Sequence, residues 1–143
     1  MRRKAFRALA LLMVCALFLG SFAFAAAPSV IEPQASSYIA NKSAYIYKNG
    51  GGSISLCFSI TATGYMTLLG TTRIELYTAA GRLMKIYTSS SYDNMLTTNN
   101  YYHSGSVNYP GVSGESYYAV MTFYAGNSKG SGTKTVTTAT VTA

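Results

Sequence analysis

Residues 53–60 read SISLCFSI, and this stretch decides the fold. Large apolar residues alternate there with serines and Cys57 without a break. Because successive side chains of a strand point to opposite sides, this period of two predicts a β-strand with one face in a core. The apolar face consists of Ile54, Leu56, Phe58 and Ile60.

Two hairpins flank this strand in the prediction. Residues 43–47 precede it through 48–52, which read KNGGG and supply the positive φ angles of a tight loop. Residues 73–77 and 83–87 form the second hairpin around 78–82. We expect one side of it to carry Ile74, Leu76, Met84 and Ile86, and the outward side to carry Arg73, Glu75, Tyr77, Lys85 and Tyr87.

The rest of the chain continues as strands and turns. A polar connection at 88–100 precedes a strand at 101–109, and PGVSG at 110–114 turns the chain. Further strands are expected at 116–124 and at 134–142, with a glycine-spaced loop at 126–132 between them. This gives seven short strands in total. They predict an all-β antiparallel β-sandwich, and a barrel is the alternative. The predicted core consists of Ile54, Leu56, Phe58, Ile60, Ile74, Leu76, Val107, Ala119, Met121 and Phe123.

The N-terminus has the pattern of an export signal. A basic cluster at residues 2–7 runs into the apolar stretch 8–19 and ends at Ala23-Phe24-Ala25. The apolar run is shorter than the roughly 20 residues that span a bilayer, which favours cleavage over retention. We therefore expect a signal peptide at 1–25, a flexible lead-in at 26–37, one domain at 38–143, and a secreted protein without a membrane anchor in the mature chain.

The charge and the cysteine content of the chain limit the partners and the cross-links that we expect. The formal net charge is +7, but the leader holds four of the eleven basic residues and no acid, so residues 26–143 carry +3. These charges are scattered, whereas nucleic-acid binding needs basic residues clustered on one face. We predict no nucleic-acid partner and no cofactor. The mature part holds one cysteine, so no disulfide can form within it.

Residues 114–121, which read GESYYAVM, resemble the entry to the sixth strand of fibronectin type III and related immunoglobulin-like domains. In those domains a tyrosine hydroxyl closes a corner onto nearby backbone. The resemblance implies that Tyr117 is this corner tyrosine. It also implies that Ala119, Met121 and Phe123 face the core and that Tyr118, Val120, Thr122 and Tyr124 face outward.

A broader stretch is similar to a family of small exported proteins of Gram-positive bacteria, of unknown function. The similarity rests on YHSGSVNY at 102–109, Gly114, the strand at 117–126, SAY at 43–45 and the ending TVTA at 140–143. It implies no catalytic or ligand-binding residue.

The sequence contains few residues of the types that catalyse reactions. His103 is the single histidine and so the only imidazole base for a nucleophilic triad. The four acids are scattered, whereas a glycosidase pair must lie within roughly 5 to 10 Å; they are Glu32, Glu75, Asp93 and Glu115. We predict a protein that is not an enzyme.

Metal binding also lacks ligands. One thiol and one imidazole fall short of the four ligands of structural zinc, and no Asp-rich loop suits calcium, so we predict no metal site. Cys57 alternates with serines on the polar face of its strand. It is either a small residue in that row or a reactive thiol that pairs between chains.

Surface tyrosines remain as candidate contacts. The predicted interaction face consists of Tyr77, Tyr87, Tyr118 and Tyr124, which suit a glycan or an extracellular protein; ordinary cross-strand pairing is the alternative role. The expected function is a secreted, non-catalytic binding module that could associate with the cell envelope. The alternatives are a structural or self-assembling extracellular protein and a secreted enzyme or toxin-like protein that uses His103.

Cleavage after Ala25 is the first testable expectation. N-terminal sequencing of the exported protein should begin at Ala26, because the small residues at positions 23 and 25 fit the cleavage site. A mature form that retains residues 11–18, or that carries a lipid on a cysteine, would contradict both cleavage and release.

Overall fold

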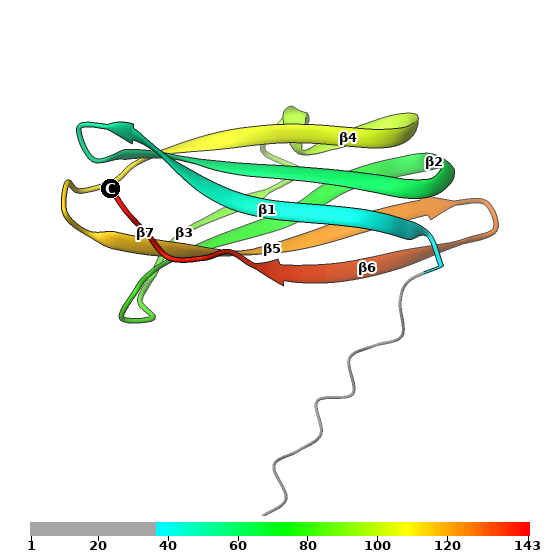
Figure 1. Ribbon diagram of the computed structural model, residues 1–143. Coiled ribbons are helices and arrows are strands. Elements are labelled where there is room, and N and C mark those ends of the chain that lie inside the picture. Colours follow the sequence, from blue (N-terminus) through cyan, green and yellow to red (C-terminus); the bar gives the residue numbers. More distant parts are fainter. Residues whose placement is uncertain (1–36) are drawn as a thin grey trace, which may run out of the picture. The chain divides into compact units, whose positions relative to one another are not determined.

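The computed structural model describes residues 37–143 (Figure 1). The predicted leader at 1–25 and the lead-in, apart from Ser37, lie outside the described residues. The described part is all-β, with seven antiparallel strands and one 3-10 turn, η1. The elements are β1 (Ile39–Gly50), β2 (Ser53–Thr78), β3 (Leu83–Thr88), η1 (Asp93–Met95), β4 (Leu96–Pro110), β5 (Ser116–Asn127), β6 (Gly130–Thr137) and β7 (Val141–Thr142).

Strand β2 runs for 26 residues and joins the two strands predicted at 53–60 and 73–77. The prediction of two separate strands is wrong because Gly64 and Gly70 do not break the strand. A register shift between Thr61 and Met66 bends it instead, and Gly70 adopts a φ of 148° that favours glycine. The residues between the two predicted strands are rich in threonine and large apolar side chains, which suit a strand.

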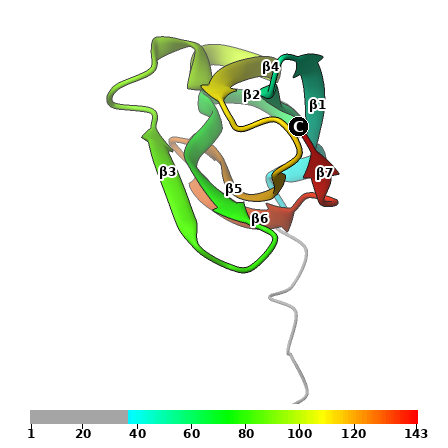
Figure 2. The same ribbon diagram turned by 90° about the vertical axis from the view of Figure 1, so that its left-hand side faces the viewer.

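The bend in β2 folds one sheet into two layers (Figures 1 and 2). The first layer contains β1, the first half of β2 and the second half of β4, and the second layer contains β3, the second half of β2, β5, β6 and β7. Since β4 pairs with both halves of β2, it crosses between the layers beside it. Strands that switch layers at a bulge are a known way to build the corner of a sandwich.

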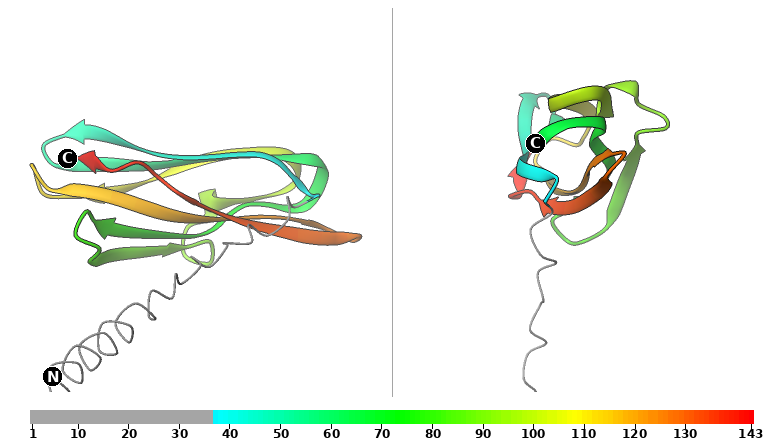
Figure 3. Two further views of the ribbon diagram at one scale, coloured as in Figure 1. Left: turned by 60° about the horizontal axis from the view of Figure 1, so that its bottom comes forward. Right: turned by 90° about the vertical axis from the view of Figure 1, so that its right-hand side faces the viewer.

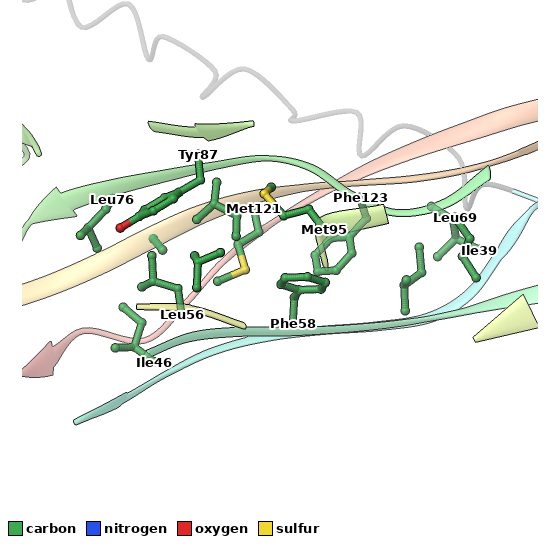
Figure 4. Close-up of a cluster of buried hydrophobic side chains, with 14 of the residues drawn as sticks. Ile39, Ile46, Leu56, Phe58, Leu69, Leu76, Tyr87, Met95, Met121 and Phe123 are labelled. Carbon is green, nitrogen blue, oxygen red and sulfur yellow. The ribbon is translucent and has the colours of Figure 1, made fainter. Parts of the chain in front are cut away.

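The core lies between the layers, and all ten residues predicted for it are buried. Figure 4 shows side chains from both layers meeting there, among them Leu56, Phe58, Met121 and Phe123. Tyr117 and Met95 are also fully buried, although the sequence pattern did not place Met95 in the core. The prediction of an antiparallel all-β fold with its core between two layers is therefore confirmed.

The β2–β3 hairpin differs from the expected register. A shift between Leu76 and Tyr77 pairs Ile74 with Tyr87 and Glu75 with Ile86. Tyr87 is therefore on the core side and only 3% exposed, so the prediction that it lies outward is wrong, and Ile86 is on the outer side with Glu75. One extra residue in a hairpin is enough to exchange the two faces of a strand.

The C-terminal third has tighter turns than expected. Residues 126–132 are not a loop: Asn127 pairs with Gly130, so only two residues join β5 to β6. The strand expected at 134–142 is divided into β6 and β7. Thr138 lies between them, and its backbone N–H donates to Ala119 O at 2.9 Å while its hydroxyl accepts from Ala119 N at 3.0 Å.

Tyr117 bonds to nearby backbone at a turn, as the resemblance implied for it. Its side chain is fully buried, and its hydroxyl accepts a hydrogen bond from the backbone N–H of Val112 at 3.0 Å. The ring also contacts Tyr109 edge-on, with centroids 5.8 Å apart. These contacts fix the turn between β4 and β5 onto the end of the core.

The outer edge of β4 is covered by side chains. Asn94 in η1 donates to Ser106 O at 2.7 Å, and the Tyr87 hydroxyl donates to Asn108 O at 3.0 Å. The Nε2–H of His103 in turn donates to Asn94 O at 2.8 Å and holds η1 in place. These bonds satisfy carbonyl groups that an edge strand would otherwise present to another chain.

Gly105 allows η1 and the core to pack closely against β4. A Cβ at this position would lie 2.5 Å from Phe58 Cζ and 2.8 Å from Asn94 O. Gly105→Ala should therefore lower the free energy of unfolding by about 1–3 kcal/mol, as overpacking does in other cores. Denaturant unfolding measures this loss.

The control is Gly64→Ala, because Gly64 is exposed and an added Cβ would meet no atom within 4 Å. Equal stability of the two variants would show that β4 and η1 are not packed as described.

Candidate functional site

The predicted interaction face lies on the outer side of β2 and β5. Tyr77, Tyr118 and Tyr124 point outward, as predicted, and each is half-buried. Tyr87 does not belong to this face, because it lies in the core and burial raises its pKa to about 12. Three of the four predicted residues therefore point to the same outer side, and two of them, Tyr77 and Tyr118, are in contact. We call the three the β5 face.

Tyr77 and Tyr118 form a cross-strand pair at one end of the β5 face. Their rings stack with centroids 5.2 Å apart and an interplanar angle of 11°. The Tyr77 hydroxyl donates to Glu75 Oε2 at 2.9 Å, and Arg73 Nε donates to Glu75 Oε1 at 2.7 Å. Arg73, Glu75 and Tyr77 thus form hydrogen bonds with one another at this end of the β5 face.

The hydrogen bonds around Glu75 shift two pKa values. The bonds from Arg73 and then from Tyr77 hold the pKa of Glu75 below its ordinary value. The same bond to the Glu75 carboxylate raises the pKa of Tyr77, because it stabilises the protonated phenol. Both groups therefore keep their usual charge at neutral pH.

Tyr124 lies six residues along β5 from Tyr118, about 20 Å away in a strand. The strand β5 turns into β6 at one end of the domain (Figure 3). Tyr124 borders a shallow hollow that is formed by residues of this turn and of β2. We call this the Tyr124 hollow; it is lined by Thr67, Leu68, Tyr124, Gly126, Asn127 and Ser128. Tyr124 is thus the residue of the β5 face that lines this hollow.

A second tyrosine surface, on the outer side of the first layer, was not predicted. We call it the β1 face; it consists of Tyr45, Tyr47 and Tyr102, which are 40%, 60% and 47% exposed. Tyr45 and Tyr47 touch edge-on with centroids 5.0 Å apart. Tyr65 and Tyr101 are also more than half exposed and form another edge-on pair, at 5.5 Å, near the bend of β2.

Hydroxyl and amide groups surround the β1 face. Ser43 and Ser59 share a hydrogen bond of 2.8 Å, and Ser55 donates to Asn108 Oδ1 at 2.7 Å. Partial burial and the neighbouring Cys57, Tyr47 and Tyr102 raise the pKa of Tyr45. The outward alternation of Tyr45 and Tyr47 opposite Ala44 and Ile46 was the sequence signal that could have revealed this surface.

Cys57 lies in the serine row, on the outer side of β2, as predicted. It is partly buried between Tyr45 and Ser106, its pairing partners on β1 and β4. Burial raises the pKa of its thiol, which disfavours the reactive thiolate. This environment suits a small packed residue better than a nucleophile.

His103 is half-buried, and its ring contacts Phe58 at a centroid distance of 5.8 Å. Its Nε2–H is used by Asn94 O, and within residues 37–143 it has no acidic hydrogen-bond partner. The described residues also contain no group of three or more His, Cys, Asp or Glu side chains that could hold a metal. The absence of an enzyme site stays a prediction.

No helix in the described part of the chain is long and apolar enough to cross a membrane. Comparisons of the chain with protein-family models, with curated proteins and with solved structures gave no match. The relationships to immunoglobulin-like domains and to exported Gram-positive proteins therefore stay predictions.

Glu75 provides a test of the β5 face by pH. Because its folded-state pKa is below the ordinary value of 4.5, Glu75 stabilises the fold above that pH, and this contribution is lost as pH falls through the lowered pKa. Glu75→Gln should therefore make stability depend less on pH in this acid range, measured by urea unfolding at several pH values.

The matched control is Glu115→Gln, which removes an exposed carboxyl that forms no ion pair within the described residues. An unchanged acid slope in Glu75→Gln would contradict the hydrogen-bonded arrangement of Arg73, Glu75 and Tyr77.

Proposed function

We propose that the mature chain is a secreted, non-catalytic binding module that acts through the outward tyrosines of its two layers. The observation that carries this proposal is the β1 face, where Tyr45, Tyr47 and Tyr102 stay 40–60% exposed on a regular sheet surface. Tyrosine offers a large, rigid contact area at low entropic cost, and it is common at the centres of binding sites.

The β1 face is uncharged. The residues that point outward with its tyrosines are serines, asparagines, threonine and Cys57, whereas Lys42 and Lys48 pair with the inward-facing Ile60 and Ile54. A surface without charge recognises partners by shape, stacking and hydrogen bonds rather than by long-range attraction. A glycan or a neutral protein surface of the cell envelope fits this chemistry.

The predicted export signal supports an extracellular place of action, since a cleaved leader of this kind directs a protein out of the cytoplasm. We also propose a relationship to immunoglobulin-like domains, which the buried Tyr117 corner supports. Many such domains are carriers of binding surfaces, so this relationship agrees with a module that has no reaction of its own.

The two alternative functions have less support. Self-assembly by strand addition needs an open edge, and two carbonyl groups on the outer edge of β4 already accept bonds from Asn94 and Tyr87. Catalysis through His103 needs an orienting acid, but its Nε2–H is bonded to a backbone carbonyl.

The test is retention of the exported protein on isolated cell walls. We expect Tyr45→Ala/Tyr47→Ala and Tyr118→Ala/Tyr124→Ala each to reduce retention at least about tenfold, since each removes two aromatic contacts. Circular dichroism and unfolding curves must show that the variants fold.

The controls are His103→Ala and Leu83→Ala, the latter removing an exposed apolar side chain of β3. Both should be retained like the unmodified protein. Retention of a folded variant that lacks all four tyrosines would show that the faces are only structural, and a loss with His103→Ala alone would favour catalysis.

A further inference from the structure

We propose that the Tyr124 hollow binds one pyranose ring of a neutral glycan, stacked on the Tyr124 side chain. This inference rests on the proposed function and assigns a ligand class to one part of it. Three observations carry it: the position of the aromatic ring, the polar residues that line the hollow, and the lack of charge.

The ring of Tyr124 occupies the space that a side chain at position 126 would fill. A Cβ on Gly126 would overlap the Tyr124 hydroxyl and lie 2.8 Å from Cζ and 2.9 Å from Cε1. The phenol therefore leans along β5 and covers Gly126, which is buried beneath it. An aromatic ring that lies along a sheet presents a broad apolar surface, which suits the C–H face of a sugar ring.

The opposite wall comes from β2. Gly126 pairs with Leu68, and Thr67 and Leu68 line the hollow just after the bend that carries β2 into the second layer. Leu68 is half-buried and adds apolar surface, while Thr67 and Ser128 are exposed lining residues that carry hydroxyl groups. The hollow thus joins an aromatic platform to hydrogen-bonding groups, as small-ligand sites do.

Asn127 is held in position for such contacts. Its Oδ1 accepts from Lys129 N at 2.9 Å, and its Nδ2 lies 3.6 Å from Met66 Sδ. A side-chain amide has two donors and two acceptor sites, so these two bonds use one donor and one acceptor site of the Asn127 amide. A fixed amide loses little entropy on binding.

No charged residue lines the hollow. An acidic sugar or a phosphate would gain no partner there, and a cation would gain no carboxylate. The combination therefore favours neutral hexoses or N-acetylhexosamines over charged ligands.

The experiment titrates the mature protein with cellotetraose and chitotetraose and follows the backbone amide NMR signals of residues 124–128. We expect shifts confined to the hollow at millimolar oligosaccharide. Tyr124→Ala should weaken binding at least about tenfold, and Tyr124→Phe, which keeps the ring, should stay within about threefold. Gly126→Ala should also weaken binding, because the added methyl group displaces the ring.

Leu83→Ala is the control, since it removes an exposed side chain of β3 that belongs to neither tyrosine face and should leave the affinity unchanged. Tetragalacturonate tests the charge argument and should bind more weakly than the neutral probes. Wild-type affinity in folded Tyr124→Ala, stronger binding of tetragalacturonate, or no shifts with either neutral probe would overturn this inference.

The two proposals fail differently. If wall retention depends on tyrosines but neither neutral oligosaccharide binds, the sugar assignment is wrong and the binding function stands. If wall retention does not depend on tyrosines, the proposed function fails even where the oligosaccharide shifts appear.

Discussion

The fold depends on the double pairing of β2. This one strand bonds to β1 and β4 in the first layer and to β3, β4 and β5 in the second, so both layers share a backbone. The constraint is met by a bend between Thr61 and Met66 that turns the sheet without breaking it. The apolar faces of both halves then meet, and the ten predicted core residues become buried together.

The sequence predicted the core well and the hairpins less well. The alternation of apolar and small polar residues at 53–60 indicates which side of the strand is buried. Leu56 and Phe58 could therefore be assigned to the core from the sequence alone. The bulge at Met84 in β3 depends on backbone geometry near the turn, which alternation does not encode, and it moved Tyr87 into the core. Likewise, the strands predicted at 53–60 and 73–77 are one strand, because alternation does not show where a strand bends at a bulge and continues.

The candidate surfaces could also be predicted only in part from the alternation of side chains. Outward positions on β5 followed from alternation, and Tyr118 and Tyr124 lie as predicted. The hollow beside Tyr124 could not be predicted, because it requires Leu68 from β2 to lie beside Gly126. The β1 face was visible in the pattern around Tyr45, but its importance comes from exposure, which depends on what the rest of the chain leaves uncovered.

The position of β2 in the middle of the sheet also bears on how fast the chain can fold. Its first half can pair with β1 across a short turn, but its second half needs β5, which lies about 50 residues further along. Closing so large a loop costs entropy before any contact repays it, and sandwiches of this kind fold in milliseconds to seconds. Until β5 arrives, the apolar side of a long strand is without cover, so the chain passes through a stage in which dilution or a holding chaperone favours productive folding over association.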